Sequence, residues 1–233
     1  MANLTYIGHS AFHLYDDRHS LLIDPFITGN PVATCAPDNF SPQTILLTHA
    51  HNDHVGDTLE IAIRTGAEVI ATHELATWLG SQGVANANGG NHGGTITFAG
   101  GSAKFVPAWH TSSYSVNGDF VAPGVPAGFV VRFSGKTIYF AGDTCLFTDM
   151  KLIGDEGLDI AVLPIGDHYT MGPRDAIRAV SLLEPSIVIP CHFNTFPPIA
   201  QDEEEFRERV ESQTQSSCVP MKPGETLDLD SSS

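Results

Sequence analysis

Thr48-His49-Ala50-His51-Asn52-Asp53-His54 is the stretch of this sequence that decides how the rest is interpreted. It holds three histidines and one aspartate within six residues, and the apolar run Ile45-Leu46-Leu47 precedes it. A short buried strand over 44–48 is therefore expected to end in this cluster. A loop at the end of a strand points several side chains out of one short segment, and imidazole is the commonest metal ligand in proteins. The stretch predicts a metal site.

Three further potential ligands stand later in the chain, each just beyond an apolar run that ends a predicted strand. They are His110, Asp143 and His192. A single pair of histidines is most simply explained as surface residues. Seven candidate ligands at the ends of four predicted strands instead favour one shared site.

The predicted elements alternate in a way that indicates an α/β fold. In each half, a meander of short strands is followed by strand–helix alternation, which favours two sheets packed face to face with helices outside, a four-layer αββα sandwich. No break in composition marks a boundary, so residues 1–233 are expected to form a single domain. We expect a turn region at 86–94 and long loops at 28–42 and 111–126 that cover a site. The main predicted strands are 4–7, 11–15, 20–24, 44–48, 68–71, 95–98, 103–107, 128–134, 136–141, 158–163 and 186–190, and the helices 58–65, 73–82, 173–183 and 202–212.

Composition restricts the partners of the protein. A formal net charge of −16, from 27 acidic and 11 basic residues, argues against nucleic acid as a partner, because phosphates need clustered Lys and Arg. The N-terminus lacks the pattern of a signal peptide, and no apolar run has the length of a membrane span, so a cytoplasmic protein with no membrane partner is expected. The four cysteines are expected to be mostly buried apolar residues. A homo-oligomer is compatible with the sequence.

The ligand pattern resembles the metallo-β-lactamase fold superfamily, whose signature is a His-x-His-x-Asp-His loop with later His, Asp and His ligands. Five other stretches are similar to small stand-alone metal-dependent hydrolases of the L-ascorbate-6-phosphate lactonase group. These stretches cover residues 7–12, 23–26, 142–144, 169–173 and 192–198.

The resemblance implies a role for each candidate ligand. One metal ion would be held by His49, His51 and His110, and a second by Asp53, His54 and His192, with Asp143 bridging both. The implied enzyme is a binuclear hydrolase whose metal-bridging hydroxide attacks an ester, lactone, amide or phosphodiester bond of a small molecule. Asp53 is the expected catalytic residue, because it can orient the hydroxide. Zn²⁺ is the first expectation for both sites, with Mn²⁺, Ni²⁺ and iron as alternatives.

Four residues around the predicted centre are candidates for substrate contact or for support of the ligands. His9, His168 and Asn194 are predicted to contact the substrate, and a structural role is an equal alternative for His9. Asp24 is interpreted either as the partner of a ligand histidine or as the cap of a turn.

Two other functions stay open at this point. A di-metal redox protein of the same fold is disfavoured by the resemblance, because redox members typically carry glutamate where this chain has His51. A metal-binding protein without catalysis is the second alternative.

Overall fold

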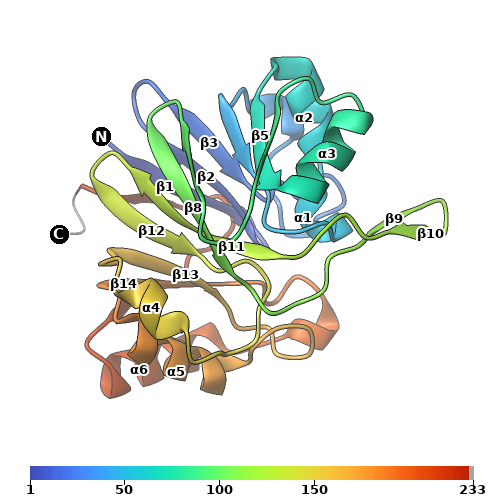
Figure 1. Ribbon diagram of the computed structural model, residues 1–233. Helices are drawn as coiled ribbons and strands as arrows, with labels where there is room; N and C mark the ends of the chain where they lie inside the picture. Colours follow the sequence, from blue (N-terminus) through green and yellow to red (C-terminus); the bar gives the residue numbers. More distant parts are fainter. Residues whose placement is uncertain (231–233) are drawn as a thin grey trace.

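The structure is a computed structural model that describes residues 1–230, and it consists of two seven-stranded sheets packed face to face (Figure 1). The strands of the first sheet are β1 (Asn3–Gly8), β2 (Ala11–Tyr15), β3 (Ser20–Ile23), β4 (Thr44–Leu46), β5 (Glu68–Thr72), β6 (Ala87–Gly90) and β16 (Thr226–Asp228). Those of the second are β7 (Thr95–Phe98), β8 (Gly101–Pro107), β11 (Ala127–Phe133), β12 (Lys136–Phe140), β13 (Ile160–Pro164), β14 (Ile187–Cys191) and β15 (Ser217–Cys218). Their orders are β16-β1-β2-β3-β4-β5-β6 and β15-β14-β13-β12-β11-β8-β7.

Helices cover the outer face of each sheet (Figure 1). Those on the first sheet are α1 (Asn52–Val55), α2 (Thr58–Thr65) and α3 (His73–Ser81), and those on the second are α4 (Met150–Gly154), α5 (Pro173–Leu183) and α6 (Glu203–Gln213). Short 3-10 turns occur at Pro37–Asn39 and Pro197–Ile199. The expected four-layer αββα sandwich is therefore confirmed.

Alternation along the strands produces these layers. On β12, Ile138 and Phe140 face the core between the sheets, whereas Tyr139 faces the core under α4 to α6. The helices complete the outer cores with one apolar face each, and on α5 that face includes Ile177 and Val180. Because successive strand side chains point to opposite faces of a sheet, a strand buried on both sides is apolar throughout.

Two expected loops contain strands. β6 lies in the predicted turn region and pairs with β5 through the backbone. Its sequence, Ala-Asn-Gly-Gly, has no apolar alternation, and it needs glycine because a Cβ at Gly90 would clash with Phe105. The hairpin of β9 (Tyr114–Val116) and β10 (Asp119–Val121) lies in the predicted loop 111–126 and projects from the body of the molecule (Figure 1).

The cysteines follow the expectation only in part. Cys191 and Cys218 are buried, whereas Cys145 is exposed and Cys35 is partly exposed. Burial raises the pKa of the Cys191 thiol well above its ordinary value. This residue packs in the core between the sheets, as expected for a structural thiol.

Parallel pairing gathers the predicted ligands at one end of the sandwich. The neighbours β3, β4 and β5 are parallel, and so are β12, β13 and β14, so the loops that follow these strands meet at one edge.

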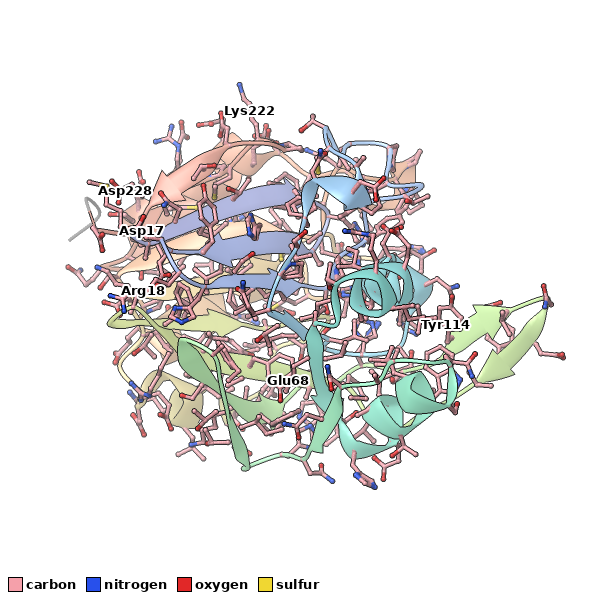
Figure 2. All side chains as sticks on the ribbon, turned by 90° about the horizontal axis from the view of Figure 1, so that it is seen from above. Asp17, Arg18, Glu68, Tyr114, Lys222 and Asp228 are labelled. Atoms are coloured by element: carbon pink, nitrogen blue, oxygen red, sulfur yellow. The ribbon has the colours of Figure 1, made fainter. Side chains whose placement is uncertain are left out.

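Tyr114 on the projecting hairpin lies at the opposite side of the molecule from Asp17 and Arg18, which occupy the turn between β2 and β3 (Figure 2). Across residues 1–230, no helix combines the length and apolarity needed to cross a membrane.

Candidate metal centre

The loop after β4 presents its ligands through a one-turn helix. His51 precedes α1, and its carbonyl accepts hydrogen bonds from the backbone N–H groups of His54 and Val55, both at 2.9 Å. Asp53 and His54 are therefore on the helical turn, while His49 and His51 lie in the extended segment before it. This change from extended to helical backbone lets four closely spaced side chains reach two neighbouring positions.

The first position is formed by His49, His51, His110 and Asp143. His51 Nδ1 lies 3.0 Å from His49 Nε2 and 3.3 Å from His110 Nε2. His110 Nε2 lies 3.5 Å from Asp143 Oδ2. The four ligand atoms are all within 4.8 Å of one another, so one metal ion could contact them together.

The second position is formed by Asp53, His54, His192 and His9, whose ligand atoms also lie within 4.8 Å of one another. Asp143 touches this group as well, because its carboxylate oxygens lie 3.1 Å from His192 Nε2 and 3.3 Å from His54 Nε2. A single carboxylate, 3% exposed, therefore stands between the two groups.

Two orphaned polar atoms show that these residues fit a cation. His54 Nε2 and Asp143 Oδ1 are buried and lie 3.3 Å apart as an ion pair, but neither atom has a hydrogen-bond partner in the described part of the chain. Buried polar atoms are nearly always paired, so each such exception needs an explanation. Imidazole and carboxylate groups are suitable ligands for divalent transition metals, and a metal ion between them would satisfy both atoms.

The electrostatics of the group also favour bound positive charge. Burial alone would lower the pKa of His54, but Asp143 and Asp24 hold it well above its ordinary value. Burial alone would raise the pKa of Asp143, but His192 and His54 hold it well below its usual range. Burial alone would also raise the pKa of Asp53, but the hydrogen bond from His9 and the charges of His54 and His9 together lower it. The carboxylates are ionised, and their field stabilises a cation at this end of the sandwich.

Asp24 holds two members of the loop from behind. This buried carboxylate accepts hydrogen bonds from Thr48 N at 2.8 Å, Thr48 Oγ1 at 2.6 Å and His54 Nδ1 at 2.8 Å. Thr48 Oγ1 lies 3.0 Å from His49 Nδ1, so it is placed to accept a hydrogen bond from that ring. Both imidazoles are thereby oriented with Nε2 toward the metal positions, which supports the interpretation of Asp24 as the partner of a ligand histidine.

The three predicted substrate contacts are placed differently. His9 is fully buried within the second group, and burial, followed by the charge of His192, lowers its pKa to about 4. His168 is exposed, and its ring packs against Tyr169. Asn194 uses its amide within its own loop, where it accepts from Gln201 N and donates to Glu203. Neither His168 nor Asn194 belongs to the two ligand groups, and their contact with substrate stays a prediction.

Sequence reasoning missed the polar residues that connect the ligand loop to residues 111–115, a segment that runs into β9. Ser112 Oγ accepts a hydrogen bond from Ala50 N at 3.1 Å, and Thr111 Oγ1 lies 3.3 Å from His51 Nε2. Asn52 forms a pair of 2.9 Å hydrogen bonds with the backbone of Ser115. Nothing in the local sequence distinguishes these residues from ordinary loop residues.

Comparisons with known proteins find relatives over nearly the whole chain. A family model described as the beta-lactamase superfamily domain matches residues 19–193. A UPF0173 metal-dependent hydrolase of Thermus thermophilus is 49% identical over 230 residues, which are 99% of this chain and 100% of the relative. Another, from Methanosarcina mazei, is 46% identical over 97% of this chain and 98% of its own. The solved structure of a metallo hydrolase from Ignicoccus hospitalis has a TM-score of 0.88 and 41% identity, covering 97% of each chain.

Proposed function

The chain belongs to the beta-lactamase superfamily and is a metal-dependent hydrolase, and on that premise we propose that it uses two divalent cations bound side by side. The proposed substrate is a small molecule with an ester, lactone, amide or phosphodiester bond. One observation carries the proposal: the buried carboxylate of Asp143 contacts histidines of both ligand groups. A carboxylate in that place can serve two cations at once, which a mononuclear site does not need.

The proposed ligands divide into two sets. The first cation would be held by His49, His51 and His110, the second by Asp53, His54 and His192, and Asp143 would contribute to both. Zn²⁺ is the metal we expect, with Mn²⁺, Ni²⁺ and iron as alternatives. When bound, such a pair supplies Lewis acidity and lowers the pKa of coordinated water from about 15.7 to about 7, which makes hydrolysis feasible near neutral pH.

The protein's own contribution is to orient and to hold charge. Asp53 is ionised, and its side chain is 34% exposed, so it is the member of the second group that reaches solvent. We propose that its carboxylate orients the attacking water and accepts its proton. Asp24 and Thr48 keep the ligand imidazoles in place during this exchange.

The charges near the centre favour an uncharged substrate. The carboxylates of Asp53 and Asp143 form ion pairs only with histidines among residues 1–230. Arg64, Lys104, Arg132, Lys151, Arg178, Arg207 and Arg209 form their ion pairs with acids outside the two groups. These seven basic side chains are therefore engaged away from the two groups, and for this reason we place esters and lactones ahead of phosphodiesters.

We further propose that residues 1–233 act as one hydrolase domain, alone or as a homo-oligomer. The net charge of −16 supports a function without nucleic acid.

Metal analysis tests the binuclear centre directly. Protein freed of metal with a chelator and reloaded with Zn²⁺ is expected to retain two ions per chain after desalting, and to unfold at a higher temperature than the metal-free form, because metal binds only the folded state. One ion per chain at saturation would contradict the binuclear proposal. Retention of iron alone, together with oxygen-reducing activity, would support the redox alternative instead.

A substrate panel tests hydrolysis and the role of Asp53. We expect the Zn²⁺-loaded protein to hydrolyse uncharged aryl esters or lactones faster than bis(aryl) phosphodiesters. Asp53→Asn is expected to lower kcat by about 10²-fold to 10⁴-fold, the usual contribution of acid–base catalysis. Glu60→Gln on α2, an exposed acid outside the site, is the control and should leave kcat unchanged. Undiminished hydrolysis by Asp53→Asn would rule out the proposed role.

A further inference from the structure

The position of His9 is fixed by the turn that it occupies and by two contacts to its carbonyl. It occupies the tight turn between β1 and β2 with φ = +60°, a conformation that non-glycine residues rarely adopt. Two hydrogen bonds to its carbonyl hold this backbone, one from His192 N at 2.7 Å and one from the Tyr6 hydroxyl at 3.1 Å. The turn is thus tied to the backbone of a proposed ligand more than 180 residues away, and the His9 side chain is directed into the second group.

Both ring nitrogens of His9 have partners. Nδ1 lies 2.9 Å from Thr195 Oγ1, and Nε2 lies 3.1 Å from Asp53 Oδ2. An ionised carboxylate is an acceptor only, so the hydrogen in the second contact belongs to His9 Nε2. Nδ1 then carries a lone pair, because a fully buried imidazolium beside two cations would be strongly disfavoured. The Thr195 hydroxyl lies 2.9 Å from Nδ1 and 3.3 Å from the Phe193 carbonyl, so we assign its hydrogen to the shorter contact, with Nδ1 as the acceptor.

From this complete pairing, and resting on the proposed binuclear function, we propose that His9 is a positioning residue for Asp53 and not a metal ligand. Thr195 donates to Nδ1 and thereby fixes the tautomer, and His9 Nε2–H holds the Asp53 carboxylate. No other hydrogen bond to that carboxylate occurs among residues 1–230. Without His9 the proposed cation alone would orient the carboxylate, which matters because Asp53 is partly exposed and lies on a single helical turn.

Two pairs of variants separate the hydrogen bond from the bulk of the side chain. His9→Gln keeps an N–H donor and His9→Ala removes it, while both pay the same backbone cost at φ = +60°. Thr195→Ser keeps the hydroxyl and Thr195→Val removes it. His13→Ala is the matched control, because the His13 ring also bonds a hydroxyl, that of Ser20 at 2.8 Å, but contacts no proposed ligand.

We expect every variant to bind two Zn²⁺ per chain at saturation. In competition with a chelator, His9→Ala should lower the affinity for the second Zn²⁺ ion about 10-fold to 100-fold. It should lower kcat by a similar factor, with little change in KM. When Co²⁺ is used instead, only the absorption spectrum of the second bound ion should differ from that of the wild type. His9→Gln should recover most of each property, Thr195→Val should show a smaller loss that Thr195→Ser restores, and His13→Ala should match the wild type.

Three results would overturn the proposal. Loss of one metal ion from His9→Ala at saturating Zn²⁺ would make His9 a ligand. Equal behaviour of His9→Gln and His9→Ala would show that the N–H donor is unimportant. An unchanged affinity for the second Zn²⁺ ion in His9→Ala would show that His9 does not position Asp53. If the wild type hydrolyses nothing, the proposed function fails, yet the metal competition and the Co²⁺ spectrum still decide the role of His9.

Discussion

Asp143→Asn is expected to lower the affinity for both metal ions together and to reduce hydrolysis to the uncatalysed background. The substitution keeps the size of the side chain but removes the negative charge that lies 3.1 Å from His192, 3.3 Å from His54 and 3.5 Å from His110. Loss of an outer partner of a metal ligand already costs about 10-fold to 100-fold in affinity. Loss of the shared carboxylate should therefore cost at least about 100-fold at each position. Titration with Zn²⁺ against a chelator, followed by activity at saturating metal, measures both effects.

The decisive result of that experiment is that the affinities for both metal ions fall. Asp53→Asn, in comparison, should weaken mainly the second, because Asp53 contacts only the second group. Asp159→Asn is a suitable control: its carboxylate accepts a 2.7 Å hydrogen bond from Thr137 N at the start of β12, the end of the strand away from Asp143. A variant Asp143→Asn that lost only one metal ion would show that Asp143 serves one cation, and the binuclear centre as proposed would be wrong.

Asp24→Asn is expected to destabilise the fold and the metal centre at once. The carboxylate is 1% exposed and accepts three hydrogen bonds from Thr48 and His54. An asparagine keeps one acceptor but turns an N–H₂ group toward a hydroxyl and an imidazole N–H, so two buried donors are left without acceptors. At about 1–3 kcal/mol for each unsatisfied group, the free energy of unfolding of the metal-free protein should fall by about 2–6 kcal/mol. Urea unfolding in the presence of a chelator measures it.

Asparagine is chosen because Asp24 has φ = +44°, a conformation that asparagine tolerates better than alanine. Zn²⁺ affinity should fall about 10-fold to 100-fold, since His49 and His54 lose their orientation. Asp16→Asn is the matched control, because Asp16 also accepts three hydrogen bonds, from Arg18 N, His19 N and Ser134 Oγ, at the far end of the sandwich. It should lower stability without changing metal affinity. Equal metal affinity in the two variants would refute the role given to Asp24.

The layer architecture could be predicted because its signals are local. A strand buried on both faces, such as Ile187–Cys191, is apolar throughout, and an amphipathic helix such as α5 repeats its apolar residues about every 3.6 positions. The segments that were predicted incorrectly lack such patterns. β6 is held by backbone pairing and by the space that glycine leaves, so its sequence has no apolar alternation that would predict a strand.

The sequence by itself determined that one loop carries several potential metal ligands, since the spacing of His49, His51, Asp53 and His54 is fixed by covalent connection. Only the tertiary structure decides which other residues lie beside this loop. His9 joins the second group because strand pairing brings the β1–β2 turn against His192, whereas His168 and Asn194 follow equally plausible strands and remain outside it. Likewise, only the folded chain places Asp24 behind His54. Contacts between residues far apart in sequence depend on how the sheets pair and pack, and neither composition nor periodicity specifies that pairing.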